Sequence, residues 1–244
     1  MKQDIDFILA SWEYKAGVAQ ARMIQAEDGR QLVQLRIDLG LLQLESTGRP
    51  DGARPHGHDT YCEYLRDQAR LARRSEQTFH MSDEQCQEAD REFVQFYHRR
   101  MCWLALRQYA LAMRDADHTL SFMDFVKRHA PNDDYRQAHE QYRGFVLFQR
   151  TQAAAALEVE KNTPDRAINE IHEGLEMIRA FHASYGREEE MENDGMVRHL
   201  RHIESTLREQ YKIDATMEEQ LQKAIADEDY ERAARLRDAL RKRE

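Results

Sequence analysis

The stretch that decides the fold is residues 82–131, with the sequence SDEQCQEADREFVQFYHRRMCWLALRQYALAMRDADHTLSFMDFVKRHAP. It contains no glycine, and its single proline is its last residue. Ser82 and Gln85 have the spacing of a capping box, which predicts that a helix begins there. Large apolar residues then recur at steps of four, four and three, which predicts a helix face turned toward the core. These residues are Phe93, Tyr97, Met101 and Leu104.

Helical patterns extend from this stretch to about residue 59 on one side and to the C-terminus on the other. Helices are expected over 60–76, 109–129, 134–160, 164–184 and 190–211. Pro131 ends the second of these, and Thr163-Pro164 gives the fourth a cap with proline at its first helical position. The chain is therefore expected to be mainly α, with a helical-hairpin array or a bundle over residues 58–213.

Residues 1–57 differ from the rest, because they hold six of the ten glycines and two of the four prolines. Apolar residues at 33, 35, 37 and 39 alternate with polar ones, which predicts a strand with one buried face. Residues 19–25 are its expected hairpin partner through a turn at Asp28-Gly29, which suits type I′. A short third strand is expected after Gly40. This part is therefore expected to be a small β-hairpin or meander that ends in a loop.

Two helical segments share one spacing of small and large residues. The pattern Y-x-x-A-M-x-x-A-x-x-x-L at 109–120 resembles the second helix of a tetratricopeptide repeat, and Trp103 matches an aromatic of the first helix. The pattern P-x-x-A-I-x-x-I-x-x-x-L at 164–175 has the same spacing 55 residues later, although the family repeats every 34 residues. The resemblance implies tetratricopeptide-like helical-hairpin packing. An ordinary helical bundle is the alternative.

The C-terminal pattern L-x-x-A-I-x-x-E-D-Y-E-x-A-A-x-L-R-D-x-L at 221–240 resembles the UVR motif. This motif is shared by two subunits of the bacterial excision-repair nuclease, by a class of Clp ATPases and by activators of protein arginine kinases. The resemblance implies a two-helix hairpin that binds a protein partner or a second copy of the chain. The residues expected to bind the partner are Leu221, Ala224, Ile225, Tyr230, Ala233, Ala234, Leu236, Arg237 and Leu240.

The physical chemistry of this segment agrees with the resemblance. Thr216-x-x-Glu219 has the capping-box spacing that begins a helix. Basic residues favour the C-terminal end of the second helix, and they are Arg235, Arg237, Arg241, Lys242 and Arg243. Two helices this short cannot bury enough apolar surface alone, so they need a partner. The alternative is that the hairpin docks on its own chain.

Composition and charge limit the possible functions. The chain has 244 residues, 41% hydrophobic and 33% charged, with a net charge of −9. This charge argues against a general nucleic-acid binder, although a local basic patch stays open. No segment approaches the roughly 18 to 20 apolar residues of a membrane helix, and Asp4 and Asp6 stand where a secretory signal is basic and then apolar. We expect a cytoplasmic protein without a membrane contact.

Several histidines and cysteines have the residue types of a metal or catalytic site. His56-Gly57-His58-Asp59 resembles part of the H-x-H-x-D-H zinc motif of metallo-β-lactamases, but Thr60 stands where the next histidine is needed. Cys62 could add a ligand, and His199 and His202 are three residues apart, yet neither group reaches the three or four ligands of a zinc site. The cysteines Cys62, Cys86 and Cys102 lack any C-x-x-C pair and are expected to be reduced, partly buried thiols. No metal, cofactor or catalytic residue is expected.

Three parts are therefore predicted: a β element over 1–57, a helical body over 58–213 and a UVR motif over 214–244. The leading hypothesis is a bacterial, non-enzymatic adaptor that binds a protein partner or itself through the hairpin. The alternative is an accessory factor of DNA repair that contacts nucleic acid through a local basic surface. An enzyme built on the loop at 49–52 has the least support, because its polar residues lack a spacing that implies a reaction.

Overall fold

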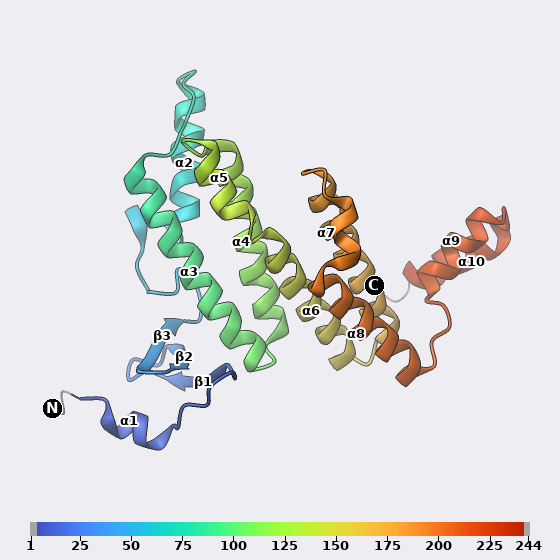
Figure 1. Cartoon of the computed structure of the whole chain (residues 1–244), viewed down its shortest axis with the longest axis horizontal. Helices are drawn as coiled ribbons and strands as arrows, with labels where there is room; N and C mark the ends of the chain where they lie inside the picture. Colours follow the sequence, from blue (N-terminus) through green and yellow to red (C-terminus); the bar gives the residue numbers. More distant parts are fainter. Residues whose placement is uncertain (1–3, 242–244) are drawn as a thin grey trace. The chain divides into compact units, whose positions relative to one another are not determined.

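The computed structural model describes residues 4–241 and divides into two compact units, residues 1–146 and 147–244. The boundary falls inside helix α6 (Arg143–Glu160). Over the described residues there are ten α-helices and one three-stranded antiparallel sheet (Figure 1), which confirms the predicted mainly α fold with an N-terminal β element. None of the helices within 4–241 is long and apolar enough to cross a membrane. The three-part division predicted from the sequence stays a prediction.

Unit 1 contains the sheet and the helices that come before α6. Its elements are α1 (Asp6–Ser11), β1 (Gln20–Gln25), β2 (Gln31–Ile37), β3 (Gly40–Glu45), the 3₁₀ turn η1 (Pro55–Gly57), α2 (Tyr61–Arg74), α3 (Asp83–Ala105), α4 (Tyr109–His129) and α5 (Asp133–Glu140). Unit 2 continues with α7 (Pro164–Ala183), the 3₁₀ helix η2 (Glu188–Asn193), α8 (Gly195–Tyr211), α9 (Met217–Ala226) and α10 (Tyr230–Arg241). The short α1 was not predicted.

The middle strand β2 is buried on both faces, so the prediction of one buried face is wrong. Gln34 and Arg36, on the face expected to be polar and exposed, are both buried. The Arg36 guanidinium donates to the carbonyls of Trp12 (2.9 Å) and Gly40 (2.8 Å), and the Gln34 amide bonds to side chains on both neighbouring strands. Because these polar groups have partners, their burial is tolerated. The strand also ends before Leu39, which is exposed.

The turn between β1 and β2 lies where it was predicted but is not of type I′. The Gly29 N–H donates to the Ala26 carbonyl (2.9 Å), and the Ala26 N–H donates to the Arg30 carbonyl (2.8 Å). Gly29 has a φ of 87°, whereas Asp28 is not among the residues with positive φ, as type I′ would require. The connection is therefore a three-residue loop whose last residue uses the conformational freedom of glycine.

Helix α3 begins at the predicted capping box, but it buries a different face from the one expected. Of the predicted stripe, Phe93, Met101 and Leu104 are half-buried, and Tyr97 is exposed. The buried face instead carries three charged residues, which are Glu92, Arg99 and Arg100. Periodicity of apolar residues did not reveal this face, because its charged side chains bond to residues distant in the sequence, as Arg99 does to Asp115.

The centre of that face is a buried ion pair between Arg99 of α3 and Asp115 of α4. The Arg99 guanidinium donates to both Asp115 oxygens, at 2.7 and 2.9 Å. It also donates to the carbonyl of Glu45 (2.9 Å), the last residue of β3, and to that of Gly48 (2.8 Å). The Trp103 indole N–H donates to the same carboxylate at 2.9 Å. One carboxylate and one guanidinium thus join α3, α4 and the end of the sheet.

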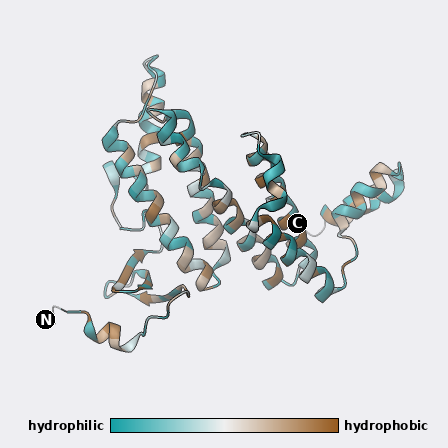
Figure 2. Cartoon of the chain, viewed as in Figure 1, coloured by the Kyte–Doolittle hydropathy of each residue, from teal (hydrophilic) through white to brown (hydrophobic). Residues whose placement is uncertain are grey.

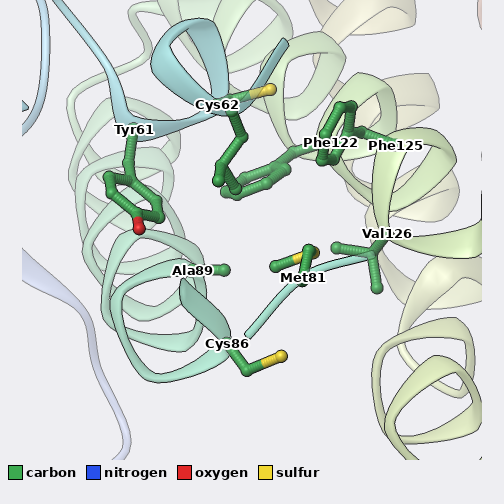
Figure 3. Close-up of a cluster of buried hydrophobic side chains, with 9 residues drawn as sticks. Tyr61, Cys62, Met81, Cys86, Ala89, Phe122, Phe125 and Val126 are labelled. Atoms are coloured by element: carbon green, nitrogen blue, oxygen red, sulfur yellow. The ribbon is translucent and has the colours of Figure 1, made fainter. Parts of the chain in front are cut away.

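A second buried carboxylate, Glu92 of α3, fixes the start of α2. It accepts hydrogen bonds from the backbone N–H groups of Tyr61 (2.6 Å) and Cys62 (3.1 Å). A negative charge at this position is favourable, because the first N–H groups of a helix have no partner within the helix. The core that follows lies between α2, α3 and α4 and is shown in Figure 3. It contains Tyr61, Cys62, Leu65, Met81, Cys86, Ala89, Phe122, Phe125 and Val126.

The helix expected over 134–160 is two helices, α5 and α6. Tyr142 N–H donates to the His139 carbonyl (3.0 Å), a tighter turn than that of an α-helix. The Arg143 guanidinium holds this turn by donating to the buried Glu140 carboxylate (2.6 Å) and to Asp124 of α4 (2.8 Å). The helix expected over 190–211 also differs from the prediction, because it begins only at Gly195, where the Asp194 carboxylate caps it.

We expect Asp115→Asn to lower the free energy of unfolding of unit 1 by about 3 to 5 kcal/mol, because it leaves the buried Arg99 without its counter-charge. The control is Asp67→Asn, which removes an exposed ion pair with Arg70 (2.6 Å) and should change stability by less than about 1 kcal/mol. Urea denaturation followed by tryptophan fluorescence tests this, since both tryptophans, Trp12 and Trp103, lie in unit 1. Equal effects of the two substitutions would contradict the role given to the buried pair.

Candidate protein-interaction site

The helix pair α9–α10 is formed by the segment in which partner-binding residues were predicted (Figure 1). Helix α9 begins with the predicted capping box, in which Thr216 and Glu219 each bond the other's backbone N–H. The turn uses Glu228, whose φ is 57°, and Asp229, whose carboxylate accepts the Arg232 N–H at 3.0 Å. The Asp229 N–H in turn donates to the Ala224 carbonyl at 2.8 Å. Local polar contacts therefore define the hairpin.

The predicted partner-binding residues fall into three groups by burial. Ala224 and Ala233 are buried, one on each helix, where small side chains allow close packing. The half-buried residues are Leu221, Ala234, Leu236 and Leu240, and the exposed ones are Ile225, Tyr230 and Arg237. Ile225 is 48% exposed and Tyr230 is 69% exposed. Figure 2 shows the hydrophilic colour predominating over the rest of this helix pair.

Two large apolar side chains on either side of the hairpin turn are thus left in solvent. The sequence predicted Ile225 and Tyr230 as partner-binding residues. It did not show that they are exposed while the alanines pack between the two helices. Of the residues expected to form a basic end, Lys242 and Arg243 lie outside the described residues. Arg237 donates to its neighbour Asp238 at 3.0 Å, so part of that positive charge is compensated locally.

The hairpin is tied to the rest of unit 2 by a polar network that was not predicted. Arg208 of α8 donates from Nη2 to Glu219 (2.5 Å), from Nε to Glu204 (2.9 Å) and from Nη1 to the Asp214 carbonyl (3.3 Å). Glu204 also lies 2.9 Å from His172 Nε2 of α7. Thr216, at the start of α9, is fully buried. The capping-box spacing predicted that Glu219 caps α9, but it did not predict Arg208 as the partner of its carboxylate.

The protonation of this network favours the ion pair. Burial alone would raise the pKa of Glu219, but hydrogen bonds from Arg208 and from the Thr216 N–H outweigh it and lower the pKa below the ordinary value. Burial lowers the pKa of Arg208, and its bonds to Glu219 and Glu204 raise it by more. Both groups are therefore charged at neutral pH. The contribution of Glu219 is present above its unfolded pKa and is lost as pH falls through the lower folded pKa.

Residues 213–242 match the UvrB/uvrC motif, abbreviated UVR. The match covers α9, α10 and the segment leading to them, so the predicted UVR hairpin is supported where it was expected. Nothing supports the predicted tetratricopeptide repeats, although Ala112, Ala167 and Ile168, which carried that resemblance, are buried as helix-packing residues would be. No curated protein and no solved structure matches the chain.

One group near the UVR hairpin has the donor atoms of a metal site. His172, Glu204 and Glu219 bring one ligand atom each within 4.8 Å of one another. However, the Arg208 guanidinium already bonds to both carboxylates. A metal ion would have to displace this cation, so the geometry fits an ion-pair network better than a metal site.

The other histidines and the cysteines considered as chemical groups are not part of the UVR hairpin sequence. The His56 ring stacks on Tyr64 with centroids 3.9 Å apart, and His58 Nε2 is 3.8 Å from Asp67. The three cysteines are free and buried, in agreement with the prediction, and burial raises the pKa of Cys62 to about 12. Such a thiol is a poor nucleophile at neutral pH. The His199 ring lies 5.7 Å from Phe148, and His202 is exposed.

We expect Arg208→Met to loosen the docking of the UVR hairpin, because Glu219 loses its charged partner. The matched control is Arg235→Met, which removes a more exposed pair with Glu231 (3.6 Å) inside α10. Hydrogen exchange of the α9 amides, followed by mass spectrometry, should accelerate roughly fivefold for Arg208→Met, as expected for a loss of about 1 kcal/mol. Unchanged exchange in α9 would show that docking does not depend on this ion pair.

Proposed function

We propose that this chain is a non-enzymatic adaptor that binds a protein partner, or a second copy of itself, through the UVR hairpin. The observation that carries the proposal is the exposure of Ile225 and Tyr230 beside the turn of a matched UVR motif. UVR motifs typically mediate protein–protein interaction. The role needs no metal, cofactor or catalytic residue.

The exposed pair gives the interface its energy. Burying an isoleucine side chain stabilises a complex by roughly 1.5 to 3 kcal/mol, and tyrosine is enriched at interface hot spots because it combines a large apolar body with a polar end. Surface ion pairs contribute about 0 to 1 kcal/mol each. The half-buried Leu221, Leu236 and Leu240 would extend the contact around this centre.

The remainder of the chain acts as a scaffold in this proposal. Arg208 fixes the hairpin to unit 2, so that a partner bound there is held to the rest of the protein. Unit 1 is held by buried ion pairs and hydrogen bonds, which is the rigid character expected of a platform. The alternative is contact with nucleic acid through α10, where Arg235, Arg237 and Arg241 are exposed. The net charge of −9 disfavours it.

We expect the full chain with Ile225→Ser and Tyr230→Ser to bind its captured and purified partner at least about 100-fold more weakly than wild type, because roughly 3 kcal/mol of apolar burial is lost. The charge control, Arg235→Ala with Arg241→Ala, should weaken binding by less than about tenfold. Calorimetric titration measures both, and light scattering follows self-association.

The opposite ranking would overturn the proposal. If the arginine pair is essential and the apolar pair dispensable, the interface is electrostatic. Salt-dependent binding of duplex DNA, measured by fluorescence anisotropy, would then favour the nucleic-acid alternative.

A further inference from the structure

Unit 1 contains a cavity of about 660 Å³, which lies within the size range of small-molecule sites. Its lining comes from α3, α4, α5, the turn after α5 and the first turn of α6. The phenylalanines and tyrosines of the lining are Phe93, Tyr97, Tyr135, Tyr142 and Phe145. A space lined by so many rings suits a ligand with an apolar body.

Asp90 of α3 is the acidic residue of this lining, and it has no cationic partner. Its Oδ1 atom accepts a hydrogen bond from the Tyr135 hydroxyl of α5 (2.8 Å) and lies 2.9 Å from His139 Nε2. Over residues 4–241, no lysine or arginine lies within ion-pair distance of this carboxylate, and its Oδ2 atom has no hydrogen-bond partner. One oxygen of a charged group is therefore available to a ligand.

The two groups that contact Asp90 are neutral at neutral pH. Burial lowers the pKa of His139 below its ordinary value, although Asp90 opposes this shift. Burial raises the pKa of Tyr135, and its hydrogen bond to Asp90 adds to the effect, so the phenol keeps its proton. These contacts position the carboxylate and join α3 to α5, but they leave its negative charge uncompensated.

The cavity opens to solvent through an apolar rim beside this carboxylate. The Asp90 side chain is 53% exposed, and the exposed lining residues also include Val94, Tyr97, Tyr142 and Phe145. The rings of Tyr97 and Phe145 have centroids 6.5 Å apart, across α3 and α6. Large apolar side chains gathered around one opening form the kind of patch that marks a binding site. Aromatic faces also attract cations rather than anions.

Arg100, also on the lining, stands away from Asp90. The two residues are ten positions apart on α3, which is roughly 15 Å along the helix axis. The Arg100 guanidinium donates to the Thr119 hydroxyl (3.0 Å). Burial lowers the pKa of Arg100 to about 10, against the opposing effect of the nearby Asp115. A cationic group bound at Asp90 can therefore keep its distance from Arg100, with only an apolar body between them.

We propose that this cavity binds a small primary amine with an apolar body, whose ammonium group donates to Asp90 while the body lies among Tyr97, Tyr142 and Phe145. Hydrogen bonds between an ammonium and a carboxylate are stronger than those between neutral groups. The apolar body would cover the exposed rim, which supplies affinity that the half-exposed carboxylate alone cannot. Every lining residue lies in unit 1, so the site is separate in sequence from the UVR hairpin.

Calorimetric titration of the full chain at neutral pH tests this with two matched pairs of probes: 2-naphthylmethylamine against 2-naphthylmethanol, and octylamine against octan-1-ol. At least one amine should bind wild type about fivefold or more tightly than its alcohol, as expected for one partly exposed charge pair. The acid 2-naphthoate should bind more weakly than 2-naphthylmethanol, because Asp90 repels it.

Asp90→Asn keeps the shape of the side chain and removes its charge, so it should abolish the preference for the amine and leave binding of the alcohol within about twofold. The matched control is Asp134→Asn, which removes an exposed carboxylate of α5 outside the lining and should leave the preference intact. Ala138→Trp, at an exposed lining residue of α5, should weaken binding of amine and alcohol alike at least about tenfold. Gln137→Trp, at its exposed neighbour outside the lining, should not.

Four outcomes would overturn the inference: equal affinity of wild type for amine and alcohol in both pairs, tighter binding of 2-naphthoate than of the amine, a preference for the amine that survives in Asp90→Asn, or no binding of any probe. If circular dichroism shows that Asp90→Asn does not fold, the wild-type preference decides together with the two tryptophan variants.

Discussion

The arrangement of unit 1 depends on the buried ion pair between Arg99 and Asp115. A carboxylate without solvent is tolerated when donors surround it, and here they come from Arg99, Trp103 and Arg114. The same guanidinium donates to two carbonyls at and just beyond the end of β3, so α3, α4 and the sheet take fixed positions together. Because the face of α3 that carries Arg99 turns inward, together with Phe96 and Trp103, the predicted apolar stripe lies at the edge of the core.

At the C-terminal end of unit 2, large apolar side chains are exposed, whereas in unit 1 a charged pair is buried. The UVR hairpin has too few residues to cover its own apolar side chains, and it buries mainly the alanines that bring its helices together. Arg208 and Glu219 hold the hairpin to α8 through polar contacts, which leave Ile225 and Tyr230 in solvent. Because polar contacts hold the hairpin to α8, its large apolar side chains can stay exposed. An adaptor needs both, since it must keep its own hairpin attached while offering a surface to a partner.

Sequence patterns predicted the parts of the fold that depend on local signals. Capping boxes located the starts of α3 and α9, Pro164 located the start of α7, and the ordered string at 221–240 located the UVR hairpin. The failures share a cause, which is pairing between residues far apart in the chain. The burial of Arg99 depends on Asp115, and the break between α5 and α6 is held by Asp124. The exposure of Ile225 was equally hidden, because it depends on which neighbours pack against the hairpin.

In the proposed function, Ile225 and Tyr230 of the UVR hairpin form the surface that contacts a protein partner. The most direct measurement is photo-crosslinking from position 230, with a photoreactive phenylalanine in place of Tyr230, compared with the same group in place of Tyr211 on α8. The account predicts a protein adduct from position 230 that disappears when Ile225→Ser is added, and none from position 211. An adduct that persists with Ile225→Ser, identical adducts from both positions, or crosslinks to nucleic acid from position 230 would contradict it.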